Sequence, residues 1–304
     1  MMPGVITPTT HNLSNSVRRN ALLAALAYLA FGLLLPHVPV PPMHTLPPGA
    51  RIALLVVPTA VFMLLQVWLA YALVRLTPRP GWAAGLTLLS VALWALALLF
   101  VHPLRHQTYA VNVVLLELRS TLPGFFVTLT GTFGGVLLSR IVRERNVLLP
   151  VALVAMPIDY IGAMTPIGFT QNAVTQHPNI VHFVSVPVPT LGSIHPIGFI
   201  GPGDALFIAF YFAAILRLEM NSRGTFWLMY ALLTLTLLYV LLPTSLPVAA
   251  LVPMGVAVVV ANVRFFTLKR DEVFAMIYAA VLVIALVVGF YVYSHHHFYH
   301  SRAH

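Results

Sequence analysis

Two aspartates lie in segments that are otherwise apolar, and their type and spacing could support acid–base chemistry. The chain has seven acidic residues, and only Asp159 and Asp204 lie inside stretches that we expect to cross a membrane. An acidic side chain at the centre of a membrane span costs roughly 2.5–3.5 kcal/mol on insertion scales, so it is a functional candidate by default. The two residues are therefore the first place to look for a site.

The predicted depths of the two acids match. Asp159 lies six residues before the predicted outer end of one span at residue 165, and Asp204 lies seven residues after the next span begins at 197. At about 1.5 Å per residue, both lie roughly 9–10 Å below the same boundary. Because consecutive spans are antiparallel, the carboxylates can meet at one level. Two carboxylates within about 3 Å cannot both ionise, so the pair can activate a water and protonate a leaving amine.

The surroundings of the two acids are expected to differ. Asp204 follows Gly201-Pro202-Gly203, where the N-terminus of a helix would favour the anion. Asp159 lies within a helix, where burial would favour the neutral form. Structural interpretations also stay open, because Asp204 could be a plain helix N-cap and Asp159 could hydrogen-bond to a neighbouring helix.

The composition is that of an integral membrane protein. Of 304 residues, 60% are hydrophobic and 8% are charged, with a mean hydropathy of +0.92, whereas soluble domains carry roughly 25% charged residues. The absence of cysteine excludes disulfides, thiolate metal sites and cysteine nucleophiles. The net charge of +9 is spread so that no basic run exceeds two adjacent residues. We expect these positive charges to orient the protein in the bilayer, and we expect no nucleic-acid partner.

Nine segments have the roughly 17–25 apolar residues that a helical span needs. With the N-terminus inside, twelve of the sixteen Lys and Arg residues fall on the cytoplasmic side, as the positive-inside rule requires. We therefore expect an all-α polytopic bundle of about nine transmembrane helices in a prokaryotic cytoplasmic membrane, with the C-terminus outside. The segments are 20–36, 52–74, 81–101, 122–139, 147–165, 197–216, 225–242, 247–263 and 273–293.

Two further patterns predict local structure. Gly131 and Gly135 form a GxxxG in the fourth predicted span, which is typical of close helix packing. Residues 183–191 (FVSVPVPTL) alternate like a strand, and their prolines restrict them to a sheet edge or an unpaired extended segment.

The segment Gly201-Pro202-Gly203-Asp204 resembles the GxGD motif of the intramembrane aspartyl proteases, the presenilin and signal peptide peptidase group. In that group one catalytic aspartate precedes the GxGD aspartate by one span, and a Pro-Ala-Leu motif begins a helix two spans later. Here Asp159 precedes Asp204 by one span, and Pro247-Val248-Ala249 is similar to the start of that motif. The resemblance covers residues 147–265 and includes Pro202 at the variable position.

The resemblance implies hydrolysis of peptide bonds in membrane-spanning peptide substrates by Asp159 and Asp204, without a metal or a cofactor. It implies a protease core over 147–265, preceded by a four-span region of unassigned role (1–146) and followed by a final helix with a His-rich tail (266–304). The residues expected to shape the site are Gly201, Pro202, Gly203, Tyr160, Pro247, Val248 and Ala249.

Two other functions remain open on the residues alone. A proton-coupled transporter could use the same two acids as a relay, and a membrane scaffold could retain them as structural groups. Other hydrolase chemistries lack their motifs, because the chain has neither HExxH nor GxSxG.

Overall fold

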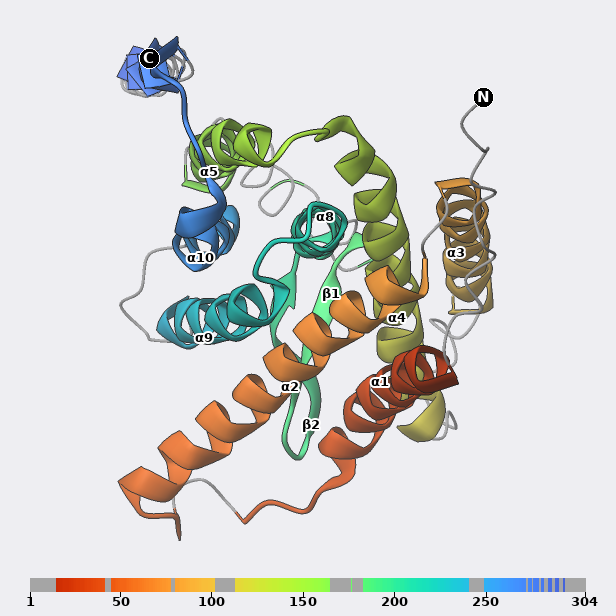
Figure 1. Cartoon of the computed structure of the whole chain (residues 1–304). Coiled ribbons are helices and arrows are strands. Elements are labelled where there is room, and N and C mark those ends of the chain that lie inside the picture. The colour runs from red at the N-terminus through yellow and green to blue at the C-terminus, as the bar shows by residue number, and fades with distance from the viewer. Residues whose placement is uncertain are drawn as a thin grey trace, which may run out of the picture.

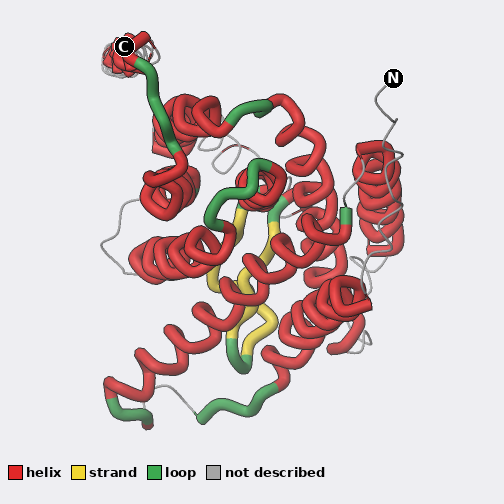
Figure 2. Tube along the Cα trace, viewed as in Figure 1, coloured by secondary structure: helices red, strands yellow, loops and turns green. Residues whose placement is uncertain are grey.

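The computed structural model describes residues 15–41, 45–77, 80–101, 113–164, 183–240 and 249–271, together with Gln176 and single residues between 273 and 292. Within them the chain is a helical bundle with one β-hairpin (Figures 1 and 2). The helices are α1 (Asn15–Leu34), α2 (Pro48–Leu76), α3 (Pro80–Val101), α4 (Val113–Leu138), α5 (Leu148–Met164), α8 (Pro202–Arg217), α9 (Ser222–Val240) and α10 (Leu251–Asn262).

Six of the described helices are long and apolar enough to cross a membrane. They include α1 to α5 and α9, whereas α8 and α10 have 16 and 12 residues. The chain is therefore a helical membrane protein, as its composition predicts. The predicted ninth span covers residues 273–293, of which the structure describes only scattered positions.

Helix α8 occupies the middle of the bundle and is seen end-on in Figure 1, with α2, α4, α9 and α10 around it. Its closest neighbour is α4, and the GxxxG motif explains why. A Cβ placed on Gly131 would lie 2.9 Å from the Cβ of Ala205, and one on Gly135 would meet the carbonyl oxygen of Leu206. The predicted role of this motif in close helix packing is confirmed, and its partner is the helix that carries Asp204.

The β-hairpin consists of β1 (Val186–Thr190) and β2 (Ser193–Ile200), which pair antiparallel with Val186 opposite Ile200. The extended conformation predicted for 183–191 is confirmed over 186–190, whereas residues 183 and 184 are helical and residue 191 lies in a turn. The sixth predicted span is wrong at its start, because residues 197–200 belong to β2 and the helix begins at Pro202. An apolar run such as IGFI suits a buried strand as well as a helix, and its pairing with β1 decides the outcome.

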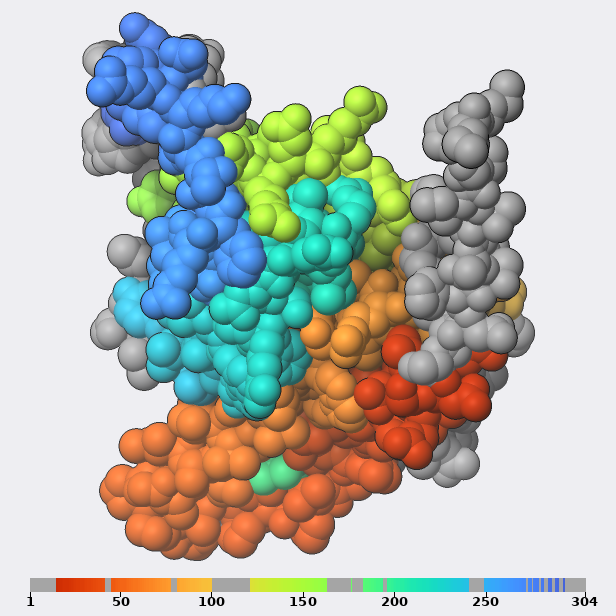
Figure 3. All heavy atoms as spheres, in the orientation of Figure 1, coloured from red at the N-terminus to blue at the C-terminus, as the bar shows by residue number. Residues whose placement is uncertain are grey.

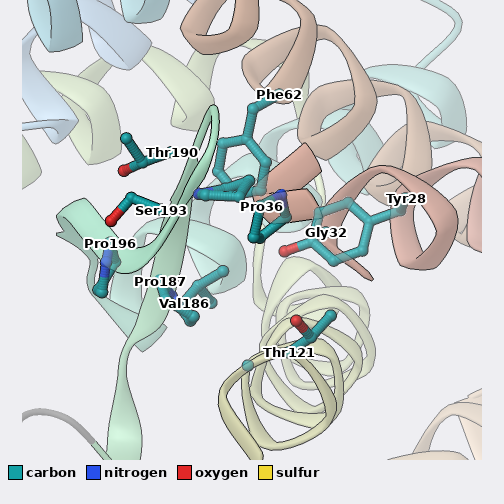
Figure 4. A pocket seen from close by; sticks show the side chains of 12 residues that line it. Tyr28, Gly32, Pro36, Phe62, Thr121, Val186, Pro187, Thr190, Ser193 and Pro196 are labelled. Atoms are coloured by element: carbon teal, nitrogen blue, oxygen red, sulfur yellow. The ribbon is translucent and has the colours of Figure 1, made fainter. Parts of the chain in front are cut away.

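The first helices hold this hairpin in place. Gly192 in its turn has a φ of +69° and donates its N–H to the carbonyl of Leu35 at 3.2 Å. In the space-filling view only a small patch of the hairpin is visible, bordered by α2 (Figure 3). Figure 4 shows the small cavity of about 30 Å³ where Tyr28, Phe62 and Thr121 face Pro187 of the hairpin. That volume holds about two waters, so the cavity is not a substrate site.

Helix α5 pairs with α10 along its length. At one end the side-chain amide of Asn146 exchanges two hydrogen bonds with the backbone of Thr267, at 2.9 and 3.2 Å. Midway, Met156 packs directly on Gly255. The neighbouring ends of α4 and α8 are tied by Arg217, which donates to the carbonyl of Ser139 at 2.7 Å. We call this side of the bundle the arginine-rich end, defined by Arg75, Arg140, Arg143, Arg145, Arg217, Arg223 and Arg264.

Candidate functional site

Asp159 and Asp204 line the same cavity, which has a volume of about 700 Å³ and lies between α5 and α8. The other described residues that line it are apolar or glycine, so Asp159 and Asp204 are the charged groups among its described lining residues. Each of the two residues is half-buried, and both lie on the wall of this one cavity. A volume of this size falls within the range of small-molecule and peptide sites.

The wall that α5 contributes follows the periodicity of a helix. Its lining residues come in steps of three and four, so that they form one continuous stripe along α5, and Asp159 lies in this stripe. Leu153 lies between the lining residues Val151 and Val154 in sequence but on the opposite face of α5, where its side chain is 38% exposed and points away from the cavity. The stripe consists of Pro150, Val151, Val154, Ala155, Ile158, Asp159 and Gly162.

Helix α8 forms the facing wall and places Asp204 in its first turn. Gly201 precedes the helix, and Asp204 Oδ2 accepts a hydrogen bond from the Gly201 N–H at 3.0 Å. This is the returning side-chain bond of a capping box. The first turn of α8 lies next to Gly131 of α4, where the absence of a side chain lets the two backbones approach. Gly203 and Phe207 complete the wall near Asp204.

Asp159 is held by a partner that is distant in sequence. Its Oδ2 accepts a hydrogen bond from the backbone N–H of Leu251 at 2.8 Å. Leu251 is the first residue of α10, so Asp159 supplies an acceptor to one of the N–H groups that every helix leaves unpaired at its start. This contact agrees with the structural alternative that the sequence left open, in which Asp159 hydrogen-bonds to a neighbouring helix. Both acids accept from backbone at the start of a helix.

Each of the two carboxylates keeps one oxygen that can take part in chemistry. Among the described residues neither Asp159 nor Asp204 has a hydrogen bond beyond its single one through Oδ2. Oδ1 of each is thus available to a water or a substrate. In addition, the N-termini of α8 and α10 bring two positive helix-dipole ends to this part of the cavity, which favours negative charge there.

Of the residues predicted to shape the site, some lie at the cavity and others do not. Gly203 lines the cavity, and Gly201 supplies the N–H that binds Asp204. Pro202 is exposed, and Tyr160 is 47% exposed on α5 and does not line the cavity.

The segment similar to Pro-Ala-Leu is described only in part. Pro247 and Val248 lie outside the described residues. Ala249 is buried and lies two residues before Leu251, where α10 begins. The described part of this segment therefore leads directly to the residue that binds Asp159.

Three residues at or near the site were not predicted from the sequence. Leu251 contributes its backbone N–H, Phe207 forms a wall one turn from Asp204, and Tyr211 is buried on the same helix. For Phe207 and Tyr211 a signal existed, because they lie three and seven residues after Asp204 and so near its face of the helix. For Leu251 no signal of that kind exists, because a backbone donor does not depend on residue type.

Among the described residues no group of three or more His, Asp or Glu side chains lies together in a way that could hold a metal ion. The ionisable groups among the described lining residues of the cavity are the carboxylates of Asp159 and Asp204. Comparisons with protein-family models, with curated proteins and with solved structures found no match for this chain.

Proposed function

We propose that this chain is an intramembrane aspartyl protease that hydrolyses peptide bonds of membrane-spanning substrates. One observation carries the proposal: two acids on different helices, 45 positions apart in sequence, line one otherwise apolar cavity of about 700 Å³. The GxGD-like segment and the position of the preceding aspartate point to the same function.

In this reaction the ionised carboxylate removes a proton from a water, and the water oxygen forms a bond to the carbonyl carbon of the substrate. The neutral carboxyl group gives its proton to the carbonyl oxygen. The C–N bond then breaks as the amide nitrogen takes up the proton that the first carboxylate removed from the water. One hydroxyl of the diol returns a proton to the second carboxylate, which leaves a new carboxyl and a new amine and restores the pair. The net change is the addition of one water, and no cofactor is consumed.

The cavity suits an extended peptide. Pro150 precedes Asp159 by nine positions in the α5 stripe, which corresponds to about 13 Å along the helix. An extended chain rises about 3.3 Å per residue, so roughly four substrate residues would fit between the aspartates and the arginine-rich end. The lining offers no charged partner there, so these substrate residues should be apolar.

A proton-coupled transporter is the second candidate. The observation that favours it is that α8 and α10 are short helices whose N-termini lie beside the two acids, an arrangement also found where broken helices bind solutes. A scaffold without catalysis is the third candidate, because each acid already has a structural hydrogen bond.

Purified protein in sealed vesicles would separate the three candidates. The assay follows both the cleavage of a synthetic membrane-spanning peptide and the uptake of protons in wild type, Asp159→Asn and Asp204→Asn. The protease predicts cleavage by wild type alone. Proton uptake that both variants lose, with no cleavage in any sample, would favour the transporter. Identical behaviour of all three proteins would favour the scaffold.

A further inference from the structure

Tyr211 carries a buried hydroxyl that has no partner. The residue is fully buried on α8, and its hydroxyl makes no hydrogen bond to any residue that the structure describes. A buried hydroxyl without a partner is costly, and two other tyrosines packed in the bundle, Tyr28 and Tyr71, avoid this cost. Tyr28 bonds to Thr128, and the Tyr71 hydroxyl lies 3.4 Å from Ser222 Oγ. The exception needs an explanation.

The position of Tyr211 supplies one. It follows Asp204 by seven residues, which places both on one face of α8, two turns apart. Side chains on a helix point back toward its N-terminus. The ring of Tyr211 accordingly packs 6.1 Å from that of Phe207, which lines the cavity one turn from Asp204. The hydroxyl is thus directed toward the end of the helix that carries the acid.

Asp159 is the acceptor that matches this donor. Asp159 lies on α5, which faces α8 across the cavity, and its Oδ2 is already occupied by the Leu251 N–H. Its Oδ1 has no hydrogen bond among the described residues. Among the described residues, Tyr211 is also the one buried, unpartnered polar side chain on a helix that carries one of the two acids. The other buried, unpartnered polar side chains lie on other elements and are Gln66, Thr132, Thr190 and Thr234.

We propose that Tyr211 is a positioning residue that donates its hydroxyl hydrogen to Oδ1 of Asp159 through one bridging water. Together with the Leu251 N–H it gives Asp159 two donors, whereas Asp204 has one from Gly201. Hydrogen bonds to the charged form favour that form. Asp159 is therefore the ionised member that accepts the proton of the water, and Asp204 is the member that carries the shared proton, which reverses the assignment expected from the sequence.

The inference rests on the proposed function, and Tyr211→Phe tests it because the ring and its packing stay in place. Tyr71→Phe is the matched control, since it removes a hydroxyl that bonds to Ser222 away from the cavity. For Tyr211→Phe we expect kcat to fall about 10- to 100-fold, the effect of losing one hydrogen bond to a charged group. KM should change little, and the unfolding temperature should stay the same or rise. Tyr71→Phe should retain kcat.

A lower unfolding temperature with unchanged kcat would overturn the proposal, because it would show a purely structural hydroxyl. An independent readout is the infrared carboxylate band that disappears in Asp159→Asn. This band should shift in Tyr211→Phe, and an unshifted band would also overturn the proposal. If Asp204→Asn cleaves like wild type, the proposed protease fails, while the band shift still reports whether Tyr211 bonds to Asp159.

Discussion

The carboxylate of Asp159 accepts a hydrogen bond from the backbone N–H of Leu251 at 2.8 Å, across 92 positions of sequence. This bond makes one side chain serve two purposes, because it caps α10 and fixes one carboxylate at the wall of the cavity. The segment similar to the Pro-Ala-Leu motif precedes Leu251, so the position of α10 and the geometry of the acid pair depend on each other.

The two roles of Asp159 can be separated by substitution. Asparagine caps helices about as well as aspartate, so Asp159→Asn should keep its stability and lose cleavage. Asp159→Ala should lose cleavage and also about 0.5–2 kcal/mol of unfolding free energy. Unfolding of both variants in detergent, followed by circular dichroism, is the measurement. Equal destabilisation by both substitutions would contradict the capping role.

The contact between α4 and α8 predicts which glycines are required. Gly131→Ala and Gly135→Ala should each destabilise the protein by about 1–3 kcal/mol, because the added methyl groups meet α8 backbone. Gly134→Ala is the matched control, since its Cβ would lie 3.8 Å from Leu206 Cδ1, an ordinary contact. Thermal unfolding compares the three variants. Similar unfolding temperatures for all of them would show that the close approach is not needed.

The α5 stripe predicts a specific way to block the cavity. Val154→Phe should fill space between α5 and α8 and lower kcat/KM for the synthetic peptide about tenfold or more. Leu153→Phe adds the same ring on the exposed side of α5 and should leave kcat/KM close to wild type. If Leu153→Phe impairs cleavage as strongly as Val154→Phe, the substrate does not occupy this cavity.

The natural absence of cysteine allows a direct test of proximity. The double variant with Asp159→Cys and Asp204→Cys should form a disulfide under mild oxidation, since both positions face one cavity. The pair Leu153→Cys with Asp204→Cys should not, because Leu153 points away. A disulfide requires Cβ atoms about 3.5–4.5 Å apart, so its formation would report that α5 and α8 approach closely. Mass spectrometry of the intact protein detects the loss of two hydrogens.

Part of this architecture is readable in the sequence. Apolar length predicts most of the helices, and the spacing of Gly131 and Gly135 predicts a close helix contact. Alternation at 183–191 predicts the first strand. The second strand was missed because its apolar residues are also acceptable in a membrane span, and only pairing with β1 distinguishes the two.

The sequence also predicts only some of the residues at the site. Rarity of acids in apolar segments singles out Asp159 and Asp204, and the structure places both at one cavity. The partner of Asp159 was not predictable, because a backbone N–H has no residue signature and lies 92 positions away. Tyr211 was missed because tyrosine is common in membrane helices, and its significance arises only from burial without a partner.

The most direct test of the account is the fate of a membrane-spanning peptide incubated with the purified protein in H₂¹⁸O. The account predicts two product peptides, with ¹⁸O in the new carboxyl group of one of them. It also predicts that Asp159→Asn and Asp204→Asn each yield neither product while remaining folded. Cleavage by either folded variant at the wild-type rate would contradict the claim that these two aspartates form a catalytic pair.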